Sequence, residues 1–183
     1  MKALIHLAPG FEEIEAINIV DVLRRADIDT QMVSINNEIQ ITGAHNITVS
    51  ADTFLKNADY ENADILILPG GMPGTKNLAE CPELLEKIET QYSKGKWIAA
   101  ICAAPLVFGR MGLLKGITAT CYPSFEPELK GATLSDDKVV VCENVITGKG
   151  PGVTIEFALE IVKQLKGEEL KAQLAAGLIY CKE

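Results

Sequence analysis

Apolar positions along the chain follow two spacings: short continuous runs, and longer stretches in which apolar residues recur every three or four positions. The short runs predict strands at 2–8, 28–35, 63–68, 97–101, 117–121, 139–142 and 145–147. The helical spacing predicts helices at 82–94, 154–165 and 168–178, and others that begin near residues 12 and 103. Short alternating pieces between 36 and 49 predict a hairpin. Strands that alternate with helices predict an α/β fold, with a mainly parallel sheet and helices on both faces.

Length and composition favour one compact domain. The chain has 183 residues, 48% of them apolar, and no repeat or long linker, which predicts a single domain over 1–183. A net charge of −8 argues against binding to nucleic acid or to an anionic membrane surface. No apolar stretch approaches the roughly 18–20 residues that span a membrane, and the N-terminus lacks a secretory pattern. We therefore expect a cytoplasmic protein whose partners are small molecules or proteins.

The five cysteines, at 81, 102, 121, 142 and 181, show neither the paired spacing of a zinc site nor a compact disulfide framework. This pattern predicts free thiols in a reducing compartment, without a metal or a cofactor.

Cys102 stands where a buried strand meets a helical segment, with small residues on both sides. Such a junction is typical of a nucleophile elbow, because small neighbours permit the tight turn that exposes the central side chain. A helix N-terminus at this point would favour the thiolate form. The alternative is that Cys102 is a buried small apolar residue, as free cysteines often are.

Glu15 lies in line with Phe11 and Ile19 on the inward face of the first predicted helix. Burial there would raise the pKa of its carboxyl group and keep it protonated, so that it donates a hydrogen bond to a thiolate. The alternative is that the acidic residues only complement the helix dipole, which is the interpretation we adopt for Glu12 and Glu13.

The glycine-rich segment 68–74 follows a strand, and its backbone N–H groups can approach a ligand closely. Together with the Ala103 amide it would form an oxyanion hole, and an ordinary tight turn is the alternative. The segment lacks the ending of a phosphate-binding loop. Neither histidine is placed beside Cys102 by chain order, since His6 lies within the first strand and His45 within the hairpin. Cys121 follows a later strand and is either an auxiliary thiol or a core residue.

The segments GFEEIE at 10–15, LPGG at 68–71, AAICA at 99–103 and KGPG at 149–152 resemble the ThiJ/PfpI superfamily, in particular the branch of the Parkinson-disease protein DJ-one. The resemblance covers essentially the whole chain. It implies a flavodoxin-like (class I glutamine amidotransferase-like) sandwich, a homodimer, and Cys102 as an oxidation-sensitive nucleophile held by protonated Glu15. Gly71 and Ala103 would be the backbone donors. Cys121 occupies the stretch in which the family carries a histidine, which argues against a histidine-dependent mechanism.

The residues and the resemblance together support two hypotheses of function. In the first, Cys102 attacks reactive α-oxoaldehydes and converts methylglyoxal to lactate without a cofactor, or removes glycation adducts from proteins or nucleotides. In the second, Cys102 is the oxidisable group of a redox sensor or stress chaperone, and its sulfenate condenses with Cys121. An intracellular cysteine peptidase and a purely structural role are less favoured.

Overall fold

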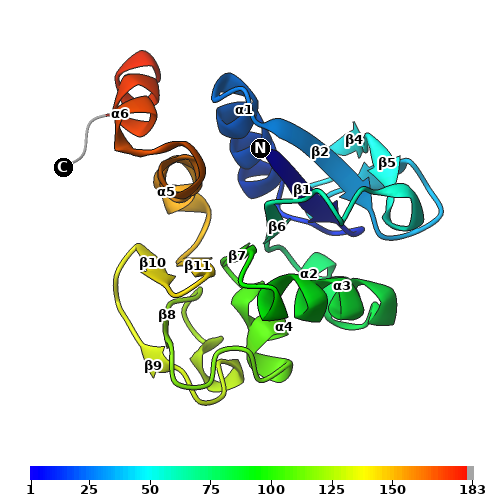
Figure 1. Cartoon of the computed structure of the whole chain (residues 1–183). Coiled ribbons are helices and arrows are strands. Elements are labelled where there is room, and N and C mark those ends of the chain that lie inside the picture. Colours follow the sequence, from blue (N-terminus) through cyan, green and yellow to red (C-terminus); the bar gives the residue numbers. More distant parts are fainter. Residues whose placement is uncertain (181–183) are drawn as a thin grey trace.

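A seven-stranded sheet with helices on both faces forms the centre of the computed structural model, which describes residues 1–180 (Figure 1). In spatial order its strands are β10 (Val139–Cys142), β11 (Val145–Gly148), β7 (Trp97–Ile101), β6 (Ile65–Leu68), β1 (Lys2–Leu7), β2 (Asp29–Ser34) and β5 (Thr53–Phe54). Neighbouring strands are parallel except for the antiparallel pair β10–β11. The predicted α/β class and mainly parallel sheet are confirmed.

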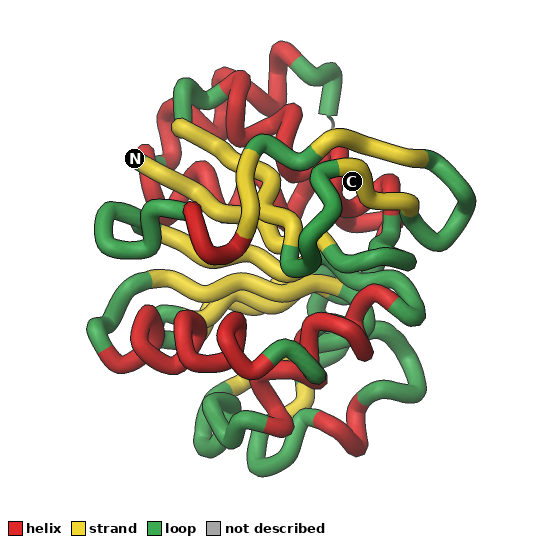
Figure 2. Tube along the Cα trace, turned by 90° about the vertical axis from the view of Figure 1, so that its right-hand side faces the viewer, coloured by secondary structure: helices red, strands yellow, loops and turns green. Residues whose placement is uncertain are grey.

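The helices form one layer on each side of this sheet (Figure 2). They are α1 (Glu13–Arg25), α2 (Gly74–Ala79), α3 (Pro82–Ser93), α4 (Pro105–Arg110), α5 (Thr154–Lys166) and α6 (Glu168–Gly177), with short 3-10 turns η1 (Leu55–Asn57), η2 (Glu126–Glu128) and η3 (Pro151–Val153). One apolar cluster lies under α1 and α5, and the other under α2, α3 and α4. Strand residues alternate between the two, with Ala3 and Ile5 in the first and Leu4 in the second.

Two predicted elements differ from the structure. The strand predicted at 117–121 is reduced to β8 (Thr118–Ala119), which pairs with β9 (Thr133–Leu134) outside the central sheet. The ladder ends there because the next amide, that of Thr120, donates to the Thr147 hydroxyl instead of to a strand carbonyl. The helix predicted from residue 103 begins only at Pro105, after a turn over 102–104, since proline is well suited to a first helical position.

The predicted hairpin is confirmed as the antiparallel pair β3 (Gln40–Thr42) and β4 (Thr48–Ser50). It is fastened to α1 by Glu13, whose carboxylate accepts hydrogen bonds from the His45 amide at 2.7 Å and from the His45 ring at 2.9 Å. Glu13 is accordingly buried. The interpretation that Glu13 only complements the helix dipole is therefore wrong, because the chain folds the hairpin loop back over the first turn of α1.

Among residues 1–180, no helix has both the length and the apolar character needed to cross a membrane. Cys181 lies outside the described residues.

Candidate active site

The loops that follow four parallel strands meet at one edge of the sheet, because the carboxyl ends of parallel strands point the same way. Backbone hydrogen bonds fasten these loops together. The Glu12 amide donates to the Gly70 carbonyl at 2.9 Å, and the Cys102 amide donates to the Gly148 carbonyl at 2.9 Å. The Tyr122 amide donates to the Cys102 carbonyl at 2.8 Å. The convergence expected from chain order is therefore present, with Cys102 at its centre.

Cys102 adopts a left-handed backbone conformation, with φ of 63°. This conformation is unfavourable for a residue other than glycine and is found where a functional side chain is held in a fixed direction. Gly70, which lies next to the Cys102 side chain, has no room for a side chain of its own. A Cβ atom added to Gly70 would come within 2.7 Å of the Cys102 Cβ and 2.8 Å of a Glu15 carboxylate oxygen. The glycine at 70 therefore lets the thiol and the carboxyl group approach one another.

Glu15 is fully buried at this meeting point. Its Oε2 accepts a hydrogen bond from the Gly70 amide at 2.6 Å, and within residues 1–180 its Oε1 has no hydrogen-bond partner. Burial is the main cause that raises the pKa of Glu15 to about 7, against the opposing effects of the Gly70 amide and the Cys102 side chain. The charge of Glu12 raises this pKa further. The predicted burial of Glu15 is confirmed, and burial raises its pKa as expected, while the protonated state at neutral pH and the chemical role of Glu15 stay predictions.

The pKa of the Cys102 thiol depends on its burial and on its neighbours. Burial is the main cause that raises its pKa to about 12, followed by the charge of Glu15 and a hydrogen bond with it, while the backbone groups of Ala103 and Gly71 lower it. The backbone groups near the start of the helical segment favour the thiolate, as expected, whereas burial and the charge of Glu15 oppose it. Protonation of Glu15 removes the charge that opposes the thiolate. The charge state of each of the two groups therefore affects the pKa of the other.

Cys121 directly precedes Tyr122, which is bonded to Cys102, but its side chain packs in a different apolar cluster from that of Cys102. It is buried in the apolar cluster under α2, α3 and α4, whereas Cys102 packs against the cluster under α1 and α5. Burial, followed by the charge of Glu126, raises the pKa of Cys121 to about 11. Its thiol therefore stays protonated at neutral pH, and its use as an auxiliary or resolving thiol remains a prediction.

Both histidines of the chain bind other groups. The ring of His6 is buried, with Nε2 2.9 Å from the Tyr60 hydroxyl and Nδ1 3.3 Å from the Ile67 carbonyl. Burial lowers its pKa to about 4, so it is neutral at physiological pH. The ring of His45 lies against Glu13, as described above.

Tyr122 is a neighbour of Cys102 that sequence reasoning missed. Its amide is bonded to Cys102, and its half-exposed side chain lies beside the backbone of Gly150. The available signal was the place of Tyr122 between Cys121 and Pro123, in a loop predicted to follow a strand. The sequence pattern indicated Cys121 as the candidate functional residue of this loop and assigned no role to Tyr122. The strand predicted through residue 121 did not indicate this contact. In the structure β8 ends at Ala119, and the loop that follows it brings the Tyr122 amide to the Cys102 carbonyl.

Residues 1–164 match the model of the DJ-1/PfpI family. The chain belongs to the DJ-1/PfpI family. It is 39% identical over 180 residues to protein dj-1beta of Drosophila melanogaster, which covers 97% of this chain and 96% of the fly protein. Over 187 residues it is 39% identical to a Caenorhabditis elegans protein named glutathione-independent glyoxalase DJR-1.2, covering 99% and 97% of the two chains.

Another DJ-1/PfpI relative is longer than this chain. Protein DJ-1 homolog B of Arabidopsis thaliana is 39% identical over 180 residues, which cover 97% of this chain but 41% of the plant protein. Among solved structures, oxidized DJ-1 of Toxoplasma gondii superposes with a TM-score of 0.95 at 34% identity and covers 99% of both chains. The sequence resemblance and the flavodoxin-like α/β architecture predicted from it are thus confirmed.

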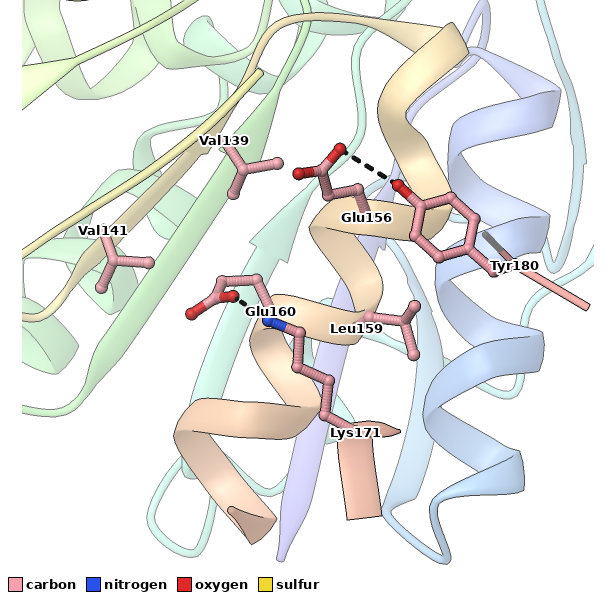
Figure 3. Close-up of a pocket in the computed structure, with 7 residues that line it drawn as sticks. All are labelled: Val139, Val141, Glu156, Leu159, Glu160, Lys171 and Tyr180. Carbon is pink, nitrogen blue, oxygen red and sulfur yellow. Dashed lines mark hydrogen bonds and ion pairs between the residues drawn. The ribbon is translucent and has the colours of Figure 1, made fainter. Parts of the chain in front are cut away.

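A hollow of about 260 Å³ lies elsewhere in this DJ-1/PfpI chain, between the edge strand β10 and helices α5 and α6 (Figure 3). Valines of β10 form its apolar wall, and its polar side chains bind one another. Glu160 accepts from Lys171 at 2.7 Å, and Glu156 accepts from the Tyr180 hydroxyl at 3.1 Å. Its described lining residues include no cysteine, serine or histidine. We therefore do not assign it to covalent chemistry.

Proposed function

We propose that this DJ-1/PfpI protein converts reactive α-oxoaldehydes, such as methylglyoxal, to 2-hydroxy acids, with Cys102 as nucleophile and Glu15 as proton carrier. The observation that carries the proposal is the fully buried Glu15 carboxyl group, which lies with the Cys102 side chain against Gly70, with the pKa of both groups raised. The relative named as a glutathione-independent glyoxalase, which is similar over nearly its full length, supports this reaction class.

The reaction begins with attack of the Cys102 sulfur on the aldehyde carbon while the thiol proton passes to Glu15. The new S–C bond leaves a negative charge on the former aldehyde oxygen, which the amides of Gly71 and Ala103 are suited to stabilise. Glu15 then passes the thiol proton to that oxygen, which gives a hemithioacetal and restores the Glu15 carboxylate. Both amide-bearing residues already act on the Cys102 sulfur in the resting protein, where they lower its pKa.

Glu15 then moves the proton needed for the internal redox step. Its carboxylate takes the proton from the former aldehyde carbon and returns it to the neighbouring carbon, while the hydroxyl proton moves from the first oxygen to the second. The former aldehyde carbon is thereby oxidised to a thioester carbonyl, and the ketone is reduced to an alcohol. The product is a thioester of Cys102 with lactate. Water cleaves this thioester, releases lactate and restores the thiol, so no external oxidant or reductant enters the balance. Removal of glycation adducts would begin at the same pair of residues.

The direct test is to incubate the purified reduced protein with methylglyoxal and measure lactate, with Cys102→Ser in parallel. Turnover that depends on Cys102 supports the proposal. Absence of lactate with the reduced wild-type protein would overturn it.

A second function, redox sensing or a stress-linked chaperone role, is favoured by the similarity to a DJ-1 structure described as oxidized. A protonated Glu15 would stabilise an oxidised Cys102 by donating a hydrogen bond to it. Mild peroxide is then expected to oxidise Cys102 further than the other cysteines, because only there would a neighbouring Glu15 stabilise the oxidised sulfur. Peptide mapping by mass spectrometry measures this order. It also tests the predicted Cys102–Cys121 disulfide, which is wrong if no cross-linked peptide forms. We also propose a cytoplasmic location, where the thiols of the protein would stay reduced.

We also propose that the chain forms a homodimer through the exposed apolar residues of α1 and the β3–β4 loop. Ile14 and Ile17 lie three residues apart on one face of α1, and Ile47 adjoins α1 through its amide, 3.4 Å from a Glu13 carboxylate oxygen. Ile14 is 55% exposed and Ile47 is 56% exposed, which is unfavourable in water for large aliphatic side chains.

Replacing Ile14 and Ile47 together by lysine is expected to convert the dimer to a monomer, because two charges would be buried without partners in the interface. Light scattering after size-exclusion chromatography measures the mass. The matched control is Ile179→Lys, another exposed isoleucine, which should keep the dimeric mass. A monomeric wild-type protein would contradict this prediction.

A further inference from the structure

A second, apolar hollow borders the edge of the sheet that carries Cys102. It has a volume of about 420 Å³ and is lined chiefly by Tyr122, Pro123, Gly150, Pro151, Gly152 and Val153. This volume falls within the range of about 300–1,000 Å³ found for small-molecule sites. The hollow is therefore large enough for a substrate group considerably bigger than methyl.

Two backbone hydrogen bonds place this hollow next to Cys102. On one side, the carbonyl of Cys102 accepts from the amide of Tyr122, which is a wall residue. On the other side, the amide of Cys102 donates to Gly148, two residues before the wall residue Gly150. The backbone of Cys102 therefore adjoins the wall of the hollow on both sides.

The ring of Tyr122 forms the apolar floor of the hollow together with the glycine-rich turn. A Cβ atom added to Gly150 would lie 3.0 Å from the Cδ2 atom of the ring, so the glycine allows the ring to lie flat against the backbone. The side chain of Tyr122 is 45% exposed, which leaves ring surface open to a ligand. Pro123 and Pro151 have no backbone N–H to offer, so this wall favours an apolar group over a polar one.

Two lysines, Lys138 and Lys149, line the border of the hollow, and of these two only Lys149 is paired with a carboxylate among residues 1–180. The ammonium group of Lys149 donates to the carboxylate and the carbonyl of Asp136, both at 3.1 Å. Its charge is therefore partly neutralised, and an anionic substituent gains less from Lys149 than an unpaired lysine would provide.

From these contacts we propose that Tyr122 is a specificity-determining residue, and that its hollow selects α-oxoaldehydes with aryl or branched alkyl side chains over methylglyoxal. The inference rests on the proposed function and deepens it by naming the substrate class. Aromatic packing against Tyr122 adds to simple burial of the substituent, and such a contact changes affinity by roughly 2–10-fold.

The first experiment compares kcat/KM for phenylglyoxal and methylglyoxal in the wild-type protein, Tyr122→Ala and Tyr122→Phe. We expect the wild type to prefer phenylglyoxal and Tyr122→Ala to lose roughly 2–10-fold of this preference. Tyr122→Phe should keep the preference, because the ring and not the hydroxyl carries it. The control is Tyr180→Ala, which removes a tyrosine that is hydrogen-bonded to Glu156 and does not line this hollow. A ratio that does not change in Tyr122→Ala overturns the inference.

A second experiment does not depend on turnover. Cys102 is alkylated either with iodoacetamide or with N-phenyl iodoacetamide, and the two rates are measured by mass spectrometry. A preference for the phenyl reagent that falls in Tyr122→Ala but not in Tyr122→Phe supports the hollow as an aryl subsite. If that result appears without any lactate formation, the subsite stands and the proposed reaction fails. If the ratio of the two alkylation rates is the same in the wild type and in Tyr122→Ala, the proposal of an aryl subsite is wrong.

Discussion

Replacing Cys102 by serine is expected to abolish the conversion of methylglyoxal to lactate while the protein stays folded. The expected fall in kcat/KM is at least roughly a thousandfold, as is usual when a nucleophile is removed. The reason is that a serine hydroxyl does not lose its proton to a neighbour such as Glu15, whose pKa is about 7. Serine is close to cysteine in size and would occupy the same position beside Gly70, so the loss reports chemistry and not packing.

The control for this experiment is Cys81→Ser, which removes a partly buried thiol outside the edge that holds Cys102. Its turnover should equal that of the wild type. Thermal melting of both variants establishes that they are folded. If Cys102→Ser retained substantial turnover, another group would be the nucleophile and the assignment of Cys102 would be wrong.

The Glu15→Gln variant is expected to lose most turnover and to gain stability at neutral and alkaline pH. Removing a general acid–base group lowers rates by roughly 10²–10⁴-fold. The gain in stability follows from burial, since Glu15 is fully buried and its Oε1 has no partner within residues 1–180. Glutamine preserves an oxygen for the Gly70 amide and never ionises.

The pH dependence of this gain has a definite sign. The pKa of Glu15 is raised in the folded protein from 4.5 to about 7, so the unfolded chain loses the proton first as pH rises. Stability that Glu15 contributes below pH 4.5 is lost as pH rises toward about 7, and the loss is complete above that value. At about 1.4 kcal/mol for each unit of pKa, the full effect is on the order of 3 kcal/mol.

Urea unfolding of the wild type and Glu15→Gln across this pH range measures the prediction. The two free energies of unfolding should differ least at the acidic end and should separate through the window in which Glu15 ionises. Glu12→Gln is the matched control, because it changes a neighbouring carboxyl on the same segment and removes only a minor influence on Glu15. A stability difference that is the same at every pH would show that the pKa of Glu15 is not raised in the folded protein.

Local pattern was sufficient for most of the fold and for the chemical groups of the site. The apolar run 97–101 predicted β7 with its observed bounds, because a short buried strand has few alternatives beside turn residues. The position of Glu15 on the apolar face of α1 predicted its burial, since helical spacing decides which side chains face the sheet. The order of strands and helices was enough to bring Cys102 and the glycine loop to one edge.

Contacts between distant segments decided the rest. Glu13 is buried because the hairpin, some thirty residues later, folds over it, and no helical pattern contains that information. The pKa values of Glu15 and Cys102 depend on how closely the two groups are buried together, and electrostatic effects of that kind vary steeply with distance and solvent access. Tyr122 adjoins Cys102 only because β8 ends early and the following loop crosses the edge of the sheet. The sequence by itself determined which residues can carry out chemistry, through local spacing and residue type. Only the tertiary structure decided which of them meet, because burial and hydrogen bonding between loops arise from the folded arrangement of the whole sheet.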